Sequence, residues 1–157
     1  MLITDAINRK IAEALKAKDE TRLSTLRLLS SALNYELIAK QHKLSQEEEL
    51  AVVRREAKQR KDSIEAFKMA QGKQTTSGTN QDERIKQEQS ELTILEEYLP
   101  SQMSDGDIET IINEAIVKTG AKSIGDMGKV IGMVMQKTAG RTEGSKVAQM
   151  VKKKLNL

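Results

Sequence analysis

GDMGKVIGMVMQKTAGRTEGSKVAQMVKKKL, residues 125–155, is the stretch that most constrains the fold of this chain. Its glycines are closely spaced, and its apolar residues, such as Val147, Met150 and Val151, recur at helical spacing. Seven basic residues stand against two acids, Asp126 and Glu143. The stretch therefore predicts a small helical module with a cationic surface, suited to contact with a polyanion rather than to covalent chemistry.

The composition of the whole chain predicts an all-α fold. The chain has 157 residues, enough for one substantial core or two small ones, and only 2% of them are aromatic. A single proline, Pro100, leaves long stretches free to be helical. Cysteine is absent, which excludes disulfides and thiolate metal sites, and no apolar run approaches the roughly 20 residues of a membrane span. With Asp5 early and no long apolar segment near the start, we expect no signal peptide and a cytoplasmic location.

Helical periodicity divides the first hundred residues into four helices and a loop. The helices are expected at residues 2–17, 20–42, 46–71 and 82–98, and the polar Gly/Ser/Thr-rich loop at 72–80. Thr4, Asp19 and Ser45 are the expected N-caps of the first three. The third helix is polar in its middle, so we expect it to project beyond the core or to cover only part of it.

Pro100 marks the expected domain boundary, because a residue before proline is biased away from helical geometry. We predict an N-terminal domain of long hairpin helices at 1–100 and a compact three-helix domain at 101–157. In the second domain Ser104 and Ser123 are expected N-caps, and Gly120 a left-handed helix stop.

Charge is distributed unevenly between these parts. Residues 1–100 hold 17 bases and 17 acids, residues 101–116 hold four acids and no base, and residues 117–157 hold nine bases and two acids. Concentrated positive charge attracts phosphate backbones. A solvated lysine-rich surface that aids solubility explains the same composition, and charge alone leaves both interpretations open.

The Gly-Lys pair at Gly128-Lys129 is not a nucleotide-binding loop. A Walker loop requires glycine where Ser123 stands and serine or threonine where Val130 stands. Gly128 and Gly132, four residues apart, are more simply explained by a close helix crossing, with Lys129 pointing to solvent.

The basic residues of the tail are the candidate nucleic-acid contacts. Arg141 follows a glycine between two expected helices and could fork two donors onto a phosphate. The lysine run at the end of the chain is a second group. The candidates are Lys129, Lys137, Arg141 and Lys146, with Lys152, Lys153 and Lys154 as secondary contacts.

Catalytic, metal and cofactor sites are not expected. His42, the only histidine, lies at a predicted helix end without an orienting partner. Glu47, Glu48 and Glu49 are acids of a first helical turn, favourable to the helix dipole. Arg22 and Arg27 flank a leucine stripe and are expected to pair with nearby acids.

Several segments together resemble the stand-alone bacterial YqeY-like family and, in the C-terminal part, the tail domain of the B subunit of the tRNA-dependent Asp/Glu amidotransferase. The resemblance is carried by residues 22–29, 58–67, 95–100, 126–130, 140–141 and 151–155. It implies the same two-domain all-α division and a tRNA-contacting role in tRNA metabolism. The same resemblance would also suggest carbon–nitrogen ligase activity with glutamine as the amide donor. That activity belongs to catalytic parts that this chain lacks, so we expect a non-catalytic module. The alternative is an adaptor that docks a partner enzyme through its N-terminal helices, without nucleic acid.

Overall fold

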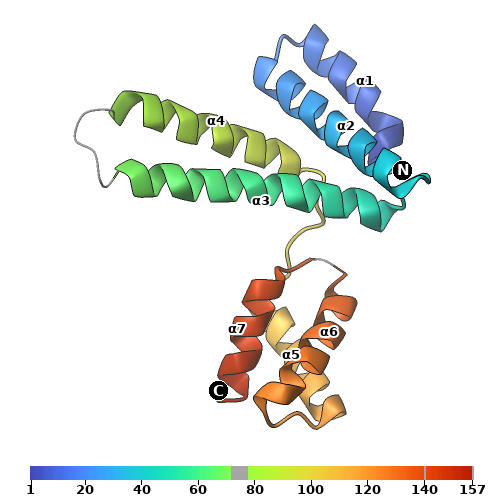
Figure 1. Cartoon of the computed structure of the whole chain (residues 1–157), viewed down its shortest axis with the longest axis vertical. Helices are drawn as coiled ribbons and strands as arrows, with labels where there is room; N and C mark the ends of the chain where they lie inside the picture. The colour runs from blue at the N-terminus through green and yellow to red at the C-terminus, as the bar shows by residue number, and fades with distance from the viewer. Residues whose placement is uncertain (72–77, 140, 157) are drawn as a thin grey trace. The chain divides into compact units, whose positions relative to one another are not determined.

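The computed structural model describes residues 1–71, 78–139 and 141–156, and throughout these residues the chain is helical or irregular, without strands (Figure 1). The all-α prediction is confirmed. The chain divides into two compact units, Met1–Leu99 and Pro100–Leu157. The first unit contains α1 (Ile3–Lys16), α2 (Glu20–Lys40), α3 (Gln46–Gln71) and α4 (Gly78–Glu96). The second contains α5 (Asp105–Thr119), a short 3-10 turn η1 (Ile124–Asp126), α6 (Met127–Thr138) and α7 (Gly144–Lys154).

The N-terminal unit consists of two helical hairpins, α1 with α2 and α3 with α4 (Figure 1). Its core is aliphatic, as the lack of aromatic residues requires, and its fully buried side chains include Leu29, Leu33, Val52, Val53 and Leu95. The first half of α3 supplies Val52, Val53 and Ala57 to this core, and its second half runs on beside α4 (Figure 1), in line with the expectation that α3 covers only part of the core. The polar middle of α3 is used in that contact, through the ion pairs of Arg60 described below.

The predicted loop at residues 72–80 is partly wrong. Residues 72–77 lie outside the described residues, but α4 begins at Gly78, four residues before the expected start. The Gln71 amide at the end of α3 donates to the Asp82 carboxylate over 2.5 Å, so contact with α3 supports the first turns of α4. Packing of this kind overrides the weak local preference of Gly, Thr and Asn for loops.

Arg60 connects α3 to α4 while largely shielded from water. Its side chain is 14% exposed, and its Nε lies 2.7 Å from a carboxylate oxygen of Glu91 and 3.6 Å from one of Glu88. Glu56, one turn earlier on α3, approaches the same guanidinium at 3.9 Å. One arginine therefore lies among three carboxylates and offsets only part of their charge, so that burial together with the charge of Glu91 raises the pKa of Glu88.

The N-terminus of α1 is capped from another helix. Thr4 was the expected N-cap, but Leu2 occupies that position and makes no side-chain cap bond. Instead Glu49 of α3, fully buried, accepts the Ile3 N–H at 2.6 Å, the Thr4 N–H at 3.1 Å and the Thr4 hydroxyl. A carboxylate here satisfies free donors and the positive end of the α1 dipole. The interpretation of Glu49 as a simple first-turn acid was therefore incomplete.

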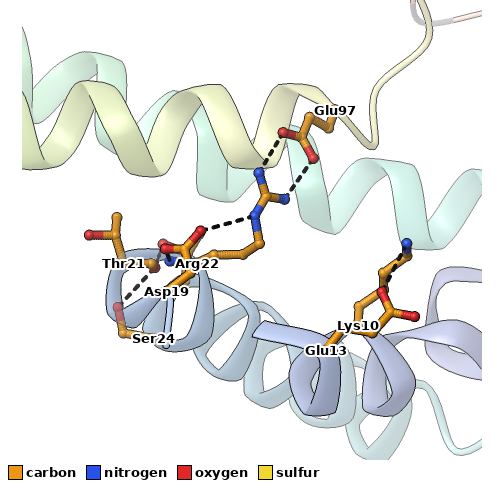
Figure 2. Close-up of polar contacts among 8 residues, drawn as sticks. Lys10, Glu13, Asp19, Thr21, Arg22, Ser24 and Glu97 are labelled. Atoms are coloured by element: carbon orange, nitrogen blue, oxygen red, sulfur yellow. Dashed lines mark hydrogen bonds and ion pairs between the residues drawn. The ribbon is translucent and has the colours of Figure 1, made fainter. Parts of the chain in front are cut away.

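Arg22 connects the start of α2 to the chain just beyond α4 (Figure 2). Its two terminal nitrogens donate to the two Glu97 oxygens at 2.8 and 2.9 Å, a bidentate pair. Asp19 is the N-cap of α2, as predicted, and accepts the Arg22 N–H at 2.9 Å. The expectation that Arg22 pairs with acids is confirmed, and this pairing lowers the pKa of Glu97.

The C-terminal unit packs three helices around a valine- and isoleucine-rich core. Its fully buried residues include Ile108, Ile112, Val130, Val147 and Val151. The helix ends follow the sequence signals. Ser104 accepts the Asp107 N–H at 3.2 Å, and Gly120 ends α5 with a φ of 65°.

The turn before α6 is closed by Asp126. Its carboxylate accepts the Lys122 N–H at 3.0 Å, and the Ser123 N–H and hydroxyl at 3.2 and 3.1 Å. These hydrogen bonds, first that from Lys122, lower the pKa of Asp126. Ser123 thus starts the 3-10 turn that leads into α6, rather than α6 itself.

Candidate nucleic-acid interface

Three of the seven candidate basic residues are held in ion pairs by acids of α5. Lys137 lies 2.7 Å from Glu114, and Lys146 and Lys154 lie 2.5 Å from Asp105 and Glu109 respectively. Hydrogen bonds from Lys137 and Lys154 lower the pKa values of Glu114 and Glu109. The acid-only segment 101–116 therefore neutralises part of the basic tail.

These pairs reduce the cationic surface without abolishing it. Each joins side chains that are more than a third exposed, and such surface pairs are worth little in water. A phosphate that contacts Lys137 must nevertheless compete with the Glu114 carboxylate. The paired lysines are consequently weaker candidates than an unpaired lysine at equal exposure.

Arg141 makes hydrogen bonds that hold the backbone of its own unit together. Its Nε donates to the Ser101 carbonyl at 3.0 Å, and its own carbonyl accepts the Met103 N–H at 3.1 Å. Both contacts hold the segment that precedes α5 against the connection from α6 to α7. Arg141 is exposed and keeps its terminal nitrogens for other partners, but part of its donor fork is committed.

Lys129, Lys152 and Lys153 form the accessible group. All three side chains are exposed, and among the described residues no carboxylate lies within ion-pair distance of them. Lys129 is near enough to Asp126 to lower its pKa, and Lys153 has the same effect on Glu109. Nearby carboxylates thus weaken the positive potential at these lysines without forming ion pairs with them.

These three lysines lie at one end of the unit. A short connection joins Thr138 to Gly144, which makes α6 and α7 antiparallel neighbours. The first turn of α6 and the last turn of α7 are therefore close together (Figure 1). Lys122, whose N–H closes the turn before α6, belongs to the same end, and sequence reasoning did not single it out. We call Lys122, Lys129, Lys152 and Lys153 the lysine end.

The glycines beside Lys129 do not serve a helix crossing, so that interpretation is wrong. Gly128 and Gly132 are exposed, and a Cβ built on either would meet nothing within 4 Å. The core contacts of α6 are made instead by Val130 and Val134, which are fully buried. Gly128 and Gly132 leave a low, bare helix surface next to Lys129, which lets a bulky ligand approach the backbone closely.

Other kinds of site find little support in the described part of the chain. It contains no group of three or more His, Cys, Asp or Glu side chains that could hold a metal. His42 is exposed, and its Nδ1 lies 2.9 Å from the Lys43 carbonyl. None of the described helices is long and apolar enough to span a membrane.

The fold and the surface define the class: a helical protein of two units, whose C-terminal unit presents a lysine-rich end. The family model of Yqey-like proteins matches residues 4–155, nearly the whole chain, and the chain therefore belongs to the YqeY-like family. Comparison with curated proteins gives no match.

Proposed function

We propose that the C-terminal unit binds tRNA through its lysine end and that the protein is a non-catalytic, cytoplasmic accessory factor in tRNA metabolism. The observation that carries this proposal is a set of exposed lysines without an ion-pair partner among the described residues, at one end of a unit in which Lys137, Lys146 and Lys154 are paired with acids. Exposed lysines that neutralise phosphates release the counterions condensed on the nucleic acid, which favours binding.

The bare glycine surface beside Lys129 supports the same proposal. The RNA backbone is bulky, and a helix face without side chains at Gly128 and Gly132 leaves room for a phosphate beside Lys129. The resemblance of this segment to the amidotransferase tail favours tRNA over other polyanions. The sequence has no cysteine and one histidine, and His42 is exposed, so binding without turnover is the role that we propose.

The test compares two triple variants by fluorescence anisotropy of labelled tRNA at low salt. Lys129→Ala/Lys152→Ala/Lys153→Ala should weaken binding by roughly tenfold or more, since each phosphate contact adds modestly. The control removes three exposed lysines from the N-terminal unit, Lys16, Lys68 and Lys86, and so lowers the net charge equally. Equal losses in both variants would show that only net charge matters, and the lysine end would lose its role.

A second candidate is an adaptor that docks a partner enzyme through the N-terminal helices. One observation favours a protein contact there: α2 exposes large apolar side chains, including Tyr35 and Ile38, which are 74% and 71% exposed. Two results together would favour the adaptor. A partner enzyme should be captured from lysate both with and without nuclease treatment, and the purified chain should not bind tRNA.

A further inference from the structure

The outward face of α2 carries a regular apolar stripe. Leu28, Tyr35 and Ile38 are 51%, 74% and 71% exposed, unusually high values for large apolar side chains that share one helix face. Ser31 lies between Leu28 and Tyr35 on this face, and Ser24 precedes Leu28. The spacing from Ser24 to Ile38 alternates between four and three residues, which is the seam of a two-helix coiled coil. We call these five residues the outer stripe.

The outer stripe is not part of the core of its own unit. The opposite face of α2 already supplies the core with Leu26, Leu29 and Leu33, each no more than 1% exposed. The helix is therefore apolar on two faces, whereas a surface helix ordinarily keeps its second face polar. A second apolar face at coiled-coil spacing indicates a second helix as its partner.

The surroundings of the stripe are almost free of charge. Between Leu28 and Ala39 the only charged residue is Glu36, and its carboxylate is bound by Arg55 of α3 at 3.1 Å. Charged residues make up 31% of the chain, so a long uncharged helix surface is a notable exception. Depletion of charge is the compositional mark of the core of a protein interface.

The stripe is complementary to itself when two copies run antiparallel. With the two-fold axis crossing the outer stripe at the level of residue 33 along α2, Leu28 of each copy faces Ile38 of the other, and Ser31 faces Tyr35. The layer of Ser31 and Tyr35 joins a small residue to a large one, and its volume is similar to that of the layer of Leu28 and Ile38. In a parallel pair, Tyr35 would meet Tyr35 and Ser31 would meet Ser31. The tyrosine layer would then be crowded, and the serine layer would leave a gap.

Electrostatics agree with the antiparallel register. Beside the seam, Asn34 faces Asn34 and Ala32 faces Ala32 near the axis, and Arg27 faces the uncharged Gln41. No like charges are brought together. A second copy therefore fits this face without repulsion, although each copy carries a net charge of +3.

The available area suits a weak, reversible dimer. The three large side chains each expose on the order of 100 Å², so two copies would bury roughly 600 Å² from these side chains alone. The flanking residues bring the total toward about 1,000 Å², near the lower limit for a specific interface. From this geometry we infer that the chain forms a homodimer through antiparallel pairing of α2 with α2 of a second copy.

Sedimentation velocity of the full chain across a wide concentration range tests the dimer. We expect a concentration-dependent monomer–dimer equilibrium, with the dissociation constant raised at least tenfold in Tyr35→Asp/Ile38→Asp. Met69→Asp on α3, where the side chain is 75% exposed, is the control and should leave the dimer unchanged. If the chain is a monomer at all concentrations, the inference is overturned, even if this face of α2 binds a different protein. A dimer that survives the α2 substitutions overturns it equally.

The register can be tested by cross-linking, because the chain has no cysteine of its own. Asn34→Cys places a thiol beside the two-fold axis and should form a disulfide-linked dimer under mild oxidation. Ser24→Cys lies about 27 Å from its counterpart in the antiparallel pair and should not. A parallel pair would bring the Ser24→Cys thiols together, so cross-linking of that variant alone contradicts the antiparallel arrangement.

Discussion

Replacing Glu49 with alanine should unfold the N-terminal unit at markedly lower denaturant concentration. The buried carboxylate accepts two N–H groups and one hydroxyl at the start of α1, and it connects α1 to α3. Hydrogen bonds to a charged group contribute about 1.5–3 kcal/mol each, although such contributions are not additive. Because Ile3 and Thr4 are only half-buried, water can replace part of the loss, and we expect a destabilisation of about 3 kcal/mol.

Tyrosine fluorescence isolates the relevant unit. The only tyrosines, Tyr35 and Tyr98, both belong to the N-terminal unit, and tryptophan is absent. The free energy of unfolding of a small protein falls by about 1–3 kcal/mol per molar urea. The urea concentration at the unfolding midpoint of Glu49→Ala should therefore be lower than that of wild type by roughly 1–3 M. Glu47→Ala, an exposed acid in the same helical turn, is the control and should stay within about 0.5 kcal/mol of wild type. If Glu49→Ala unfolds at the wild-type midpoint, the capping argument is refuted.

Four further substitutions probe the remaining interactions. The Arg22 guanidinium lowers the pKa of Glu97, so the pair stabilises the fold above the ordinary glutamate pKa of about 4.3, and this stability is lost as the pH falls through the lowered value. Urea midpoints of wild type and Glu97→Gln should therefore differ at pH 7 and converge at about pH 2; a constant difference would contradict the pairing. Gly128→Ala and Gly132→Ala should each stabilise α6 by about 0.5–1 kcal/mol, measured by thermal circular dichroism, since a Cβ has room at both positions. Destabilisation would show a hidden close contact. Glu114→Gln should tighten tRNA binding severalfold in anisotropy titrations because it frees its paired lysine; unchanged affinity would exclude that lysine from the contact.

Much of the fold could be predicted because its signals are local. The caps at Asp19 and Ser104, the left-handed stop at Gly120 and the apolar period of each helix depend on residues within one or two turns. Such features need no knowledge of which helices are neighbours. The cap of α1 shows the limit, since Glu49 lies 46 residues from Ile3 and only the tertiary fold brings them together.

The candidate site was harder to predict for the same reason. The sequence indicates seven basic residues, but their availability depends on which acids of α5 face them. The spacing of Gly128 and Gly132 suggested a buried crossing, whereas the helix phase places Val130 and Val134 inward and the glycines outward. A helical wheel anchored on those valines would have found the exposed glycine face.

The salt dependence of tRNA affinity tests the proposed function most directly. Affinity should be measured from about 50 to 200 mM salt for wild type and for Lys129→Ala/Lys152→Ala/Lys153→Ala. If each of the three lysines neutralises one phosphate, the wild-type logarithmic slope should be steeper than that of the variant by roughly 2–3. A measurable wild-type slope that the substitutions flatten is the expected result. An identical slope in both proteins, or no binding by the wild type at the lowest salt, would contradict binding of tRNA through the lysine end.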